Sequence, residues 1–376
     1  MENESSKNSA CDMKRKIKEN PEPHLTVIDV PEFTWEEIES ARDNNRLLTV
    51  GLELSNFCNF RCVYCYRNTG NPLPDELALE ELIDAAHQAI KLGARKVGIV
   101  GAGEPTLDNR LIPLLKSLKN VEKVNIFTNG TGITPELGQI LVDFQVGIIL
   151  KVNSLNPDIH DTLVGRKGGY NLMRKGFKNL LDAGCPPSRI TIESVITKQN
   201  IKELPSLWRW SRDRGFVPFF ERVTPQGRAL LADVSVPPLQ VLELFEEIKR
   251  IDEQLYRYTW GIHPPWVSQS CLRHYHYCLI DACGNVLPCS GVDIAVGNIR
   301  EEPLADILTS PVIQDLRFID QTIKGHCKNC EFIPFCYGCR GAAYQLTGDY
   351  LAADPQCWKP LVKEMKEDHK NRTNKK

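Results

Sequence analysis

The sequence lacks the features that would mark a membrane protein, a secreted protein or a nucleic-acid-binding protein. No apolar run approaches the roughly 18–20 residues that a membrane-spanning helix needs, and the polar start MENESSKNSACDMKRK has no apolar stretch of a signal peptide. The net charge is only −2, and the longest basic block is the tail KNRTNKK, which argues against a nucleic-acid surface. We therefore expect a cytoplasmic protein without a membrane or nucleic-acid partner.

Cysteine, in contrast, is abundant and unevenly placed. The 376 residues contain 14 cysteines, of which three lie between Cys58 and Cys65 and nine between Cys271 and Cys357. Secreted disulfide-rich proteins are usually much shorter, whereas clustered cysteines in a cytosolic chain more often bind metal or take part in redox chemistry. We interpret the two isolated residues, Cys11 and Cys185, as ordinary free thiols.

From Leu47 onward, short apolar segments alternate with amphipathic ones, which predicts parallel strands joined by helices. The expected strands are Leu48–Leu54, Lys96–Val100, Lys123–Phe127, Val146–Val152, Arg189–Ile196 and Val217–Val223. The expected helices are Leu77–Leu92, Arg110–Leu118, Pro135–Phe144, Tyr170–Ala183, Ile201–Arg214 and Pro238–Tyr256. Six such units favour an α/β fold with a partial (β/α)6 barrel of the TIM type, although a doubly wound sheet has the same periodicity.

After Pro264 the segments become short, aromatic and rich in cysteine. A region with so few long apolar elements is expected to fold around metal, because it cannot bury a large core of its own. The sequence therefore predicts three parts. These are a polar segment with a short helix at residues 1–45, the partial barrel at 46–257, and a small cysteine-rich domain with a polar tail at 258–376.

The first cysteine cluster, formed by Cys58, Cys62 and Cys65, has the spacing CxxxCxxC. A 4Fe–4S cluster usually takes four thiolates, so three thiolates leave one iron open to an outside ligand. Two other interpretations are a helix with three buried cysteines on one face and a zinc site, which normally needs four protein ligands. Aromatic residues among the cysteines, including Tyr64, suit a shielded site that also holds an adenine ring.

Glycine-rich and polar turns follow the next three expected strands. The first is Gly101-Ala-Gly103-Glu104-Pro105, in which the glycines allow a ligand to approach the backbone and Glu104 can pair with a cation. Thr128-Asn129-Gly130 and Asn153-Ser154 come next, and a plain turn and a helix N-cap are their alternatives. Because the carboxyl ends of parallel barrel strands form the active-site face, we expect these turns to lie together.

The second cysteine region combines separate cysteines with closely spaced pairs. Cys271, Cys278, Cys283 and Cys289 precede the run Cys327-x2-Cys330-x5-Cys336-x2-Cys339 and the last residue, Cys357. Close pairs separated by a long gap usually hold tetrahedral metal sites with ligands from two loops. Seven or eight thiolates would serve two iron–sulfur clusters or two zinc ions, so structural zinc remains an alternative.

CxxxCxxC with an aromatic residue before the last cysteine, followed one β/α unit later by GxGEP, resembles the radical SAM superfamily. The resemblance implies that Cys58, Cys62 and Cys65 bind three irons of a 4Fe–4S cluster and that S-adenosylmethionine chelates the fourth. It also implies reductive cleavage of this cofactor to a 5′-deoxyadenosyl radical, which abstracts a substrate hydrogen. The residues implied to line the cofactor site are Tyr64, Gly101, Gly103, Glu104, Pro105, Asn129 and Ser154.

The C-terminal region resembles the SPASM domain, the auxiliary-cluster extension of radical SAM enzymes, especially members related to pyrroloquinoline-quinone maturases and haem-pathway enzymes. By this resemblance, one auxiliary 4Fe–4S cluster is bound by Cys327, Cys330, Cys336 and Cys357. The other is bound by Cys271, Cys289 and Cys339, with Cys278 as the candidate fourth ligand and Cys283 as an incidental thiol. We expect this second cluster to lie nearer the active site and to accept substrate electrons.

The resemblance predicts a radical SAM oxidoreductase or maturase that oxidises or crosslinks a peptide or protein. Oxidation or decarboxylation of a cofactor or tetrapyrrole precursor is the alternative enzyme activity, and a structural zinc-binding module is the alternative outside the enzymes. Flavodoxin or ferredoxin is the expected electron donor. About 45 residues precede the first strand, which argues mildly against leader-dependent peptide modification. Charged and polar residues near the barrel interior either contact the substrate or form structural pairs: Arg166, Glu193, Glu221, Arg222, Gln226 and Arg228.

Overall fold

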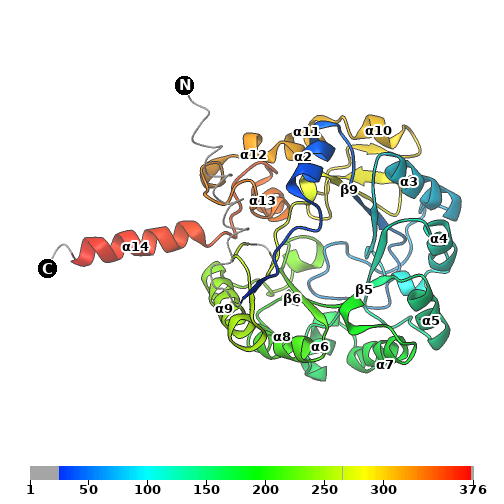
Figure 1. Cartoon of the computed structure of the whole chain (residues 1–376), viewed down its shortest axis with the longest axis horizontal. Helices are drawn as coiled ribbons and strands as arrows, with labels where there is room; N and C mark the ends of the chain where they lie inside the picture. The colour runs from blue at the N-terminus through cyan, green and yellow to red at the C-terminus, as the bar shows by residue number, and fades with distance from the viewer. Residues whose placement is uncertain (1–24, 265, 374–376) are drawn as a thin grey trace.

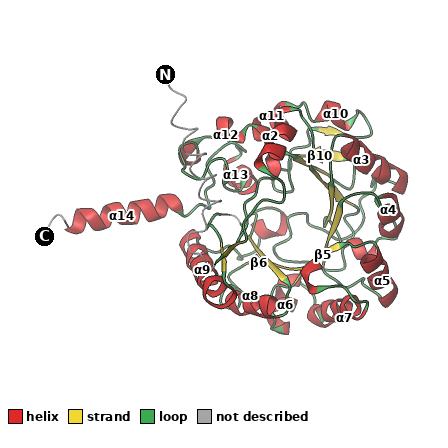
Figure 2. Cartoon of the chain, viewed as in Figure 1, coloured by secondary structure: helices red, strands yellow, loops and turns green. Residues whose placement is uncertain are grey.

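Nine strands form one curved sheet with helices on its outer side, and the computed structural model describes residues 25–264 and 266–373 (Figures 1 and 2). Within these residues the strand order is β11-β10-β9-β2-β3-β4-β5-β6-β7. Neighbouring strands from β2 to β7 are parallel and follow each other in sequence order. Parallel neighbours in sequence order, each joined by a helix, form a partial barrel, which confirms the predicted fold.

The predicted strands and helices of the barrel are present, with ends shifted by a few residues. The parallel strands are β2 (Thr49–Glu53), β3 (Lys96–Val100), β4 (Lys123–Thr128), β5 (Gly147–Lys151), β6 (Ile190–Ile196) and β7 (Val217–Arg222). The helices between and after them are α3 (Leu79–Lys91), α4 (Leu111–Ser117), α5 (Pro135–Asp143), α6 (Pro157–Val164), α7 (Gly169–Asp182), α8 (Leu204–Asp213) and α9 (Pro238–Ile251). A π-helical turn (Asp252–Tyr256) continues α9.

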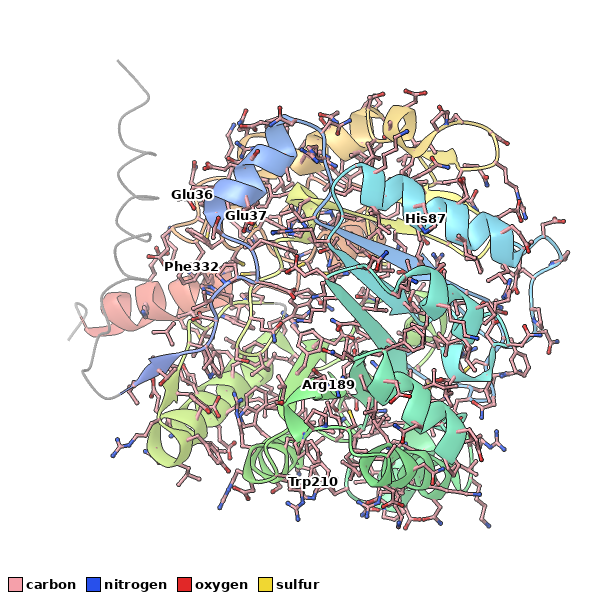
Figure 3. The ribbon with its side chains drawn as sticks, turned by 45° about the vertical axis from the view of Figure 1, so that its right-hand side comes forward. Glu36, Glu37, His87, Arg189, Trp210 and Phe332 are labelled. Carbon is pink, nitrogen blue, oxygen red and sulfur yellow. The ribbon has the colours of Figure 1, made fainter. Side chains whose placement is uncertain are left out.

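The alternation of side chains along the strands separates the core from an interior cavity. In β3, Val97 and Ile99 are fully buried in the apolar core between the sheet and the helices. Gly98, between them, faces the barrel interior. A Cβ atom added to Gly98 would lie 3.8 Å from its nearest neighbours, so a methyl group would fit there. Successive strand residues point to opposite faces, so the small and polar alternate residues keep the barrel interior open. On the outside, exposed Glu36 and His87 mark the solvent sides of helices α2 (Trp35–Asp43) and α3 (Figure 3).

Helix α6 was not predicted, because it has only eight residues and few apolar positions. Its ends are nevertheless well defined: the Asn156 side chain accepts a hydrogen bond from the Asp158 amide at 2.9 Å, and Gly165 ends the helix with φ +62°. Both are standard capping arrangements. The end of this helix lies against the first cysteine loop, so the missed element helps to build the site.

Three strands from the cysteine-rich region extend the barrel sheet. Strand β9 (Tyr277–Ile280) pairs parallel with β2, while β10 (Asn285–Leu287) and β11 (Gly297–Asn298) continue antiparallel. The barrel and the cysteine-rich region, on either side of the expected boundary at residues 257–258, therefore share one sheet. The remaining elements are β1 (Thr26–Val27), β8 (Tyr258–Thr259), α10 (Leu304–Ile307), α11 (Pro311–Arg317), α12 (Ile319–Thr322), α13 (Arg340–Thr347) and α14 (Lys359–Thr373).

Figure 1 shows α11, α12 and α13 near α2, α10 beside α3, and α14 extending away from the body towards the C-terminus. Among the described helices, none combines the length and the apolar character that crossing a membrane requires.

Candidate active site

A cavity of about 800 Å³ occupies the barrel interior, and residues at both the amino and the carboxyl ends of the strands line it. Its size is typical of sites for small molecules or for a few residues of a peptide. All three cysteines of the first cluster line it, together with the Gly101–Glu104 turn and Asn129. The expectation that the turns after successive strands meet at one face is therefore confirmed for these segments.

The three cysteines of the first cluster lie together on the loop after β2. Cys58 is buried, whereas Cys62 and Cys65 are partly buried. Burial and the neighbouring Cys65 and Cys58 sulfurs raise the pKa of the Cys62 thiol to about 12. Thiols that face one another in this way ionise readily only beside a compensating cation, so the arrangement suits a metal group bound to all three sulfurs.

Main-chain contacts from both sides fix the shape of this loop. The amide nitrogens of Arg61 and Val63 donate to the Val164 and Leu163 oxygens at the end of α6, both at 3.0 Å. On the other side, the Arg228 side chain donates to the Cys62 oxygen at 2.8 Å. The loop geometry is therefore set by α6 and by the segment after β7, not by its own sequence alone.

Gly227 shows how closely that segment approaches the cysteine loop. It has φ +59°, and a Cβ atom there would lie 2.6 Å from the Cys65 oxygen and 2.5 Å from the Tyr66 oxygen. Only glycine combines this backbone conformation with so close an approach. Two arginines that were expected near the substrate also serve the loop: Arg228, and Arg166, which donates to the Asn59 oxygen at 2.9 Å.

The glycine-rich turn packs directly on the same cysteine loop. A Cβ atom at Gly103 would lie 2.1 Å from the Phe57 oxygen and 2.6 Å from the Ser55 oxygen. The next amide, that of Glu104, donates to the Phe57 oxygen at 2.8 Å. The second glycine of GxGEP thus brings two backbones together, which is a different role from the direct ligand approach that the sequence suggested.

Glu104 links the turns after β3 and β4. Its Oε1 accepts hydrogen bonds from the Thr106 amide and hydroxyl at 3.0 and 2.6 Å and from the Thr128 hydroxyl at 2.5 Å. Its Oε2 accepts from the Asn129 amide at 2.6 Å. Because each carboxylate oxygen has about two acceptor positions and Oε2 accepts one hydrogen bond, Oε2 keeps one position for a ligand in the cavity. Burial nevertheless raises the pKa of Glu104.

The other residues expected at the cofactor site divide into two groups. Tyr64 lines the cavity, and its hydroxyl accepts a hydrogen bond from the Asn153 amide group at 2.6 Å. Ser154 does not reach the cavity: it is fully buried, its hydroxyl binds the Glu203 carboxylate, and it accepts from the Asn156 amide at 2.9 Å. Pro105 begins a short 3₁₀ turn. Ser154 and Pro105 therefore shape their loops and do not line the cavity.

The cysteines of the C-terminal region form two separate groups. Cys271, Cys289 and Cys339 lie near enough to act on one another's ionisation. Burial is the main cause that raises the pKa of Cys339 to about 12, and the charges of Cys289 and Cys271 raise it further. The loop of Cys289 and the start of α13 meet at two glycines, since a Cβ on Gly291 would lie 2.7 Å from the Gly341 Cα. We call this set the inner group, because Ser270 and Ser290, the neighbours of Cys271 and Cys289, line the cavity.

The outer group consists of Cys327, Cys330, Cys336 and Cys357, which influence one another's ionisation. Asp354 lies between the two groups: it is buried, its Oδ2 accepts from the Cys339 amide at 2.9 Å, and its charge acts on thiols of both sets. No residue adjacent to an outer-group cysteine lines the cavity within the described chain.

Cys278, the candidate fourth ligand of the inner group, is not brought to that group. It lies on β9, where alternation turns it away from Tyr277 and into the apolar core with Ile280 and Val286. The basic side chain that acts on its thiol is Arg317, and no inner-group cysteine is among the described groups that do so. Cys283 lies in the turn after β9, with its amide bound to Asp281 at 2.9 Å. The described residues thus supply three inner-group cysteines.

The donor sets suit iron–sulfur clusters better than single ions. Four sulfurs around one zinc ion at about 2.3 Å lie about 3.8 Å apart, and no three His, Cys, Asp or Glu side chains among the described residues are grouped to hold one ion. Sets of three and four cysteines are the ligand numbers that an iron–sulfur cluster with an open iron and a fully ligated cluster take.

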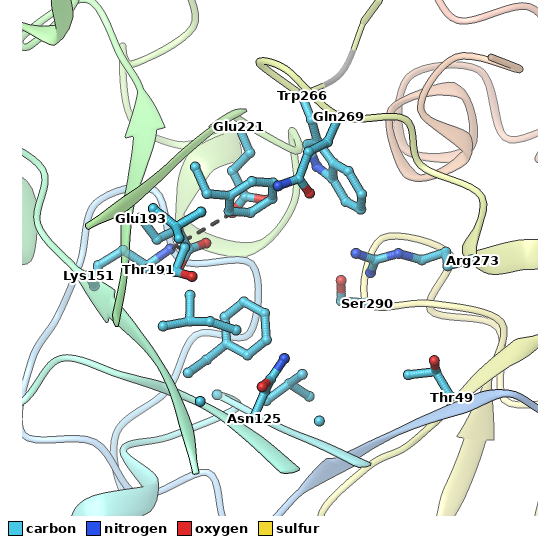
Figure 4. Close-up of a pocket in the computed structure, with 18 of the residues that line it drawn as sticks. Thr49, Asn125, Lys151, Thr191, Glu193, Glu221, Trp266, Gln269, Arg273 and Ser290 are labelled. Carbon is cyan, nitrogen blue, oxygen red and sulfur yellow. Dashed lines mark ion pairs between the residues drawn. The ribbon is translucent and has the colours of Figure 1, made fainter. Parts of the chain in front are cut away.

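The opposite wall of the cavity carries a charged cluster that the sequence only partly revealed. Lys151, at the end of β5, lies 2.7 Å from Glu193 and 3.8 Å from Glu221 (Figure 4). Burial and the Glu221 charge raise the pKa of Glu193 to about 8, against the lowering effect of Lys151. The two glutamates were expected at the interior, and Lys151 was missed although a lysine that ends an apolar strand signals such a position.

Arg222 lines this region and Gln226 borders it, and each makes a hydrogen bond to the cysteine-rich region, although the buried Gln226 Oε1 has no partner among the described residues. Arg222 binds the Gln356 main-chain oxygen, and its guanidinium lies 5.9 Å from the centre of the Trp358 ring. The Gln226 amide donates to Asp293 at 2.9 Å. Both side chains therefore connect the barrel to the cysteine-rich region.

Comparison with known proteins gives two domain matches. Residues 52–210 match the radical SAM superfamily model, and residues 271–331 match the SPASM model, described as an iron–sulfur cluster-binding domain. Two curated relatives are similar over most of the chain. The AdoMet-dependent heme synthase of Methanosarcina barkeri is 26% identical, covering 82% of this chain and 95% of the relative. The sporulation killing factor maturation protein SkfB of Bacillus subtilis is 25% identical, covering 79% and 71%.

A solved structure shares the fold. SuiB of Streptococcus suis, bound to its precursor peptide SuiA, has a TM-score of 0.66 and 19% identity, covering 94% of this chain and 87% of that one. The first match contains Cys58, Cys62 and Cys65, and the second contains four of the seven cysteines of the inner and outer groups, ending before Cys336, Cys339 and Cys357. The chain is therefore an enzyme that carries a radical SAM superfamily domain followed by a SPASM iron–sulfur cluster-binding domain, with S-adenosylmethionine and iron–sulfur clusters as its cofactors.

Proposed function

We propose that this enzyme oxidises a peptide substrate whose reacting residue enters the barrel cavity. The observation that carries the proposal is the convergence of three features on one cavity: the Cys58–Cys65 loop, the Lys151 cluster and the neighbours of the inner group. When bound, the first cluster and S-adenosylmethionine supply a radical that removes a substrate hydrogen atom, and an auxiliary cluster supplies an electron acceptor.

The chain's own residues have defined tasks in this proposal. Cys58, Cys62 and Cys65 hold the first cluster, and the free acceptor position of Glu104 Oε2 binds the methionyl ammonium group. The inner group holds the acceptor cluster next to the cavity, and the outer group holds a second auxiliary cluster. Loss of a hydrogen atom and then an electron leaves the substrate with one proton to release. Glu221, paired with Lys151 at 3.8 Å, is positioned to take it.

Support for a peptide substrate comes from the relatives. SkfB is named as a maturation protein, and SuiB was solved with a precursor peptide. A tetrapyrrole precursor is the second candidate, favoured by the match to 95% of the length of a heme synthase. We keep flavodoxin or ferredoxin as the electron donor. The cytoplasm is the expected compartment, because cysteines that bind clusters must escape disulfide formation and reducing compartments keep them reduced.

The test is anaerobic incubation of the cluster-loaded enzyme with S-adenosylmethionine, dithionite and candidate peptides, followed by mass spectrometry. We expect 5′-deoxyadenosine together with a peptide product lighter by two hydrogens. The variant with Cys58, Cys62 and Cys65 all replaced by Ala should form neither product and keep its auxiliary clusters. A wild-type enzyme that forms no 5′-deoxyadenosine would refute the activity, and a product only from tetrapyrroles would select the second candidate.

A further inference from the structure

One wall of the cavity carries an arginine that has no acidic partner. Arg273 follows the inner-group residue Cys271, and its guanidinium points into the cavity (Figure 4). Its guanidinium carbon lies 4.8 Å from the centre of the Trp266 ring and 5.4 Å from that of Tyr277. Its main-chain oxygen accepts from the His276 amide at 3.1 Å, but among the described residues its guanidinium makes no hydrogen bond or ion pair. The two rings therefore hold its position while its donors stay available.

The other cationic side chains of the cavity wall are occupied. Lys151 is paired with Glu193 at 2.7 Å, and Lys123 is paired with Glu32 at 2.7 Å. Lys96 pairs with the same Glu32 at 2.5 Å. Arg222 and Arg189 bind the main-chain oxygens of Gln356 and Val142. Among the described residues that line the cavity, Arg273 is thus the lysine or arginine whose side chain has neither a hydrogen bond nor an ion pair.

The position of Arg273 is built by several elements. The Val267 amide donates to the Phe220 oxygen of β7 at 2.9 Å, which fixes the loop that carries Trp266 beside the barrel. Tyr277 begins β9 and is thereby fixed to β2. A guanidinium held between two rings presents its donors as a preformed planar fork. The side chains next to it on the wall, Gln269 and Ser290, are polar and uncharged (Figure 4).

We propose that Arg273 binds a carboxylate of the substrate and thereby orients the reacting carbon, an inference that rests on the proposed function and names its substrate class. A planar guanidinium pairs with a carboxylate through two parallel hydrogen bonds. The carboxylate belongs to an acidic side chain or the C-terminus of a peptide, or to a propionate of a tetrapyrrole. The Lys151 cluster on the opposite wall then faces the other end of the bound group.

A different role for Arg273 would be to balance the charge of the inner group. Cys271 and Cys289 both act on its charge. Arg222 offers a matched control, because it also lines the cavity and is influenced by Cys339 and Cys357, yet its guanidinium is already bound to a main-chain oxygen. If charge balance is the role, Arg222→Met and Arg273→Met should have similar effects.

The experiment measures equilibrium binding of two probe pairs to the cluster-loaded enzyme with S-adenosylmethionine. One pair is a set of short Asp- and Glu-containing peptides and the same set with Asn and Gln. The other is a porphyrin tetracarboxylate and its methyl ester. We expect one acid probe to bind the wild type about 10- to 100-fold more tightly than its neutral partner, as charge-assisted bonds imply. Arg273→Met should remove this preference, Arg273→Lys should keep part of it, and Arg222→Met should keep all of it.

The inference is overturned if the wild type prefers neither acid probe, a result that needs no folded variant. It is also overturned if Arg273→Met keeps the preference, or changes only the electron paramagnetic resonance of the auxiliary clusters. The two probe pairs distinguish a peptide carboxylate from a tetrapyrrole one. Formation of 5′-deoxyadenosine by the wild type is measured separately, so failure of the proposed function is recognised independently of carboxylate binding.

Discussion

A methyl group at Gly103 would test how the cofactor site is built. Its Cβ would lie 2.1 Å from the Phe57 oxygen and 2.6 Å from the Ser55 oxygen, whereas ordinary contacts begin near 3.4 Å. Both obstacles are backbone atoms, which no rotamer change can move. The turn and the cysteine loop would have to separate by about 1 Å, and overpacking of this kind typically costs about 1–3 kcal/mol.

The separation would act on the site more than on the fold. It would break the 2.8 Å hydrogen bond between the Glu104 amide and the Phe57 oxygen, and so displace Glu104 from Cys58. A misplacement of about 1 Å in a catalytic constellation can lower the rate about 100-fold. We therefore expect Gly103→Ala to form 5′-deoxyadenosine about 10- to 100-fold more slowly, while its auxiliary clusters stay intact.

The assay is anaerobic 5′-deoxyadenosine formation at varied S-adenosylmethionine concentration, together with iron analysis and melting temperature. Gly98→Ala is the control, because a Cβ on Gly98 meets no atom closer than 3.8 Å and the residue lies on β3, shortly before the turn. It should remain folded and keep its clusters. Wild-type rate and cofactor affinity in Gly103→Ala would refute the idea that this close approach positions the site.

Three further predictions follow from other parts of the site. Cys278→Ser should keep the wild-type iron content because its thiol lies in the apolar core, whereas Cys339→Ser should lose iron; equal loss in both would contradict the inner group as described. Gly291→Ala places a Cβ 2.7 Å from the Gly341 Cα. This variant should bind less iron in its auxiliary clusters but form 5′-deoxyadenosine as the wild type does. Retention of all iron would contradict the prediction. Folding raises the pKa of Glu193 from 4.5 to about 8. Between these two pH values the folded protein therefore holds a proton on Glu193 that the unfolded protein has lost, so the free energy of unfolding should fall as the pH rises. Glu193→Gln should flatten this dependence in denaturant titrations, and unchanged slopes would exclude Glu193 as its source.

The barrel could be predicted because its local signals agree with one another. Each of the six parallel strands is a short apolar segment bounded by turns, and the helices between them are amphipathic. Motifs that follow strands of this kind must meet at one face, which placed the Cys58–Cys65 loop beside the Gly101–Glu104 turn without knowledge of the structure. Helix α6 escaped because eight residues carry too little periodicity to distinguish it from a loop.

Other features could not be predicted, because they depend on residues far apart in the sequence. Arg273 has no signal of its own: its unpaired state depends on Trp266 and Tyr277 and on Glu221, whose charge acts on Arg273 without forming an ion pair with it. Ser154 looked like a cofactor ligand because of its place after β5, but Glu203 binds its hydroxyl. Cys278 looked like a metal ligand because it is a cysteine. Its position in the core could have been predicted only if β9 had been recognised as a strand.

Cysteine spacing also leaves open how the cysteines of each group are brought together. In this chain close backbone contacts position two of the three groups. Gly227 approaches the Cys65 oxygen at the first cluster, and the Gly291–Gly341 contact joins the Cys289 loop to the helix that begins after Cys339. Backbone contacts transmit small displacements directly, because no side chain can rearrange to absorb them. Substitution of these glycines should therefore impair cluster binding as strongly as substitution of residues that touch the cofactors, even though none of the glycines is a ligand.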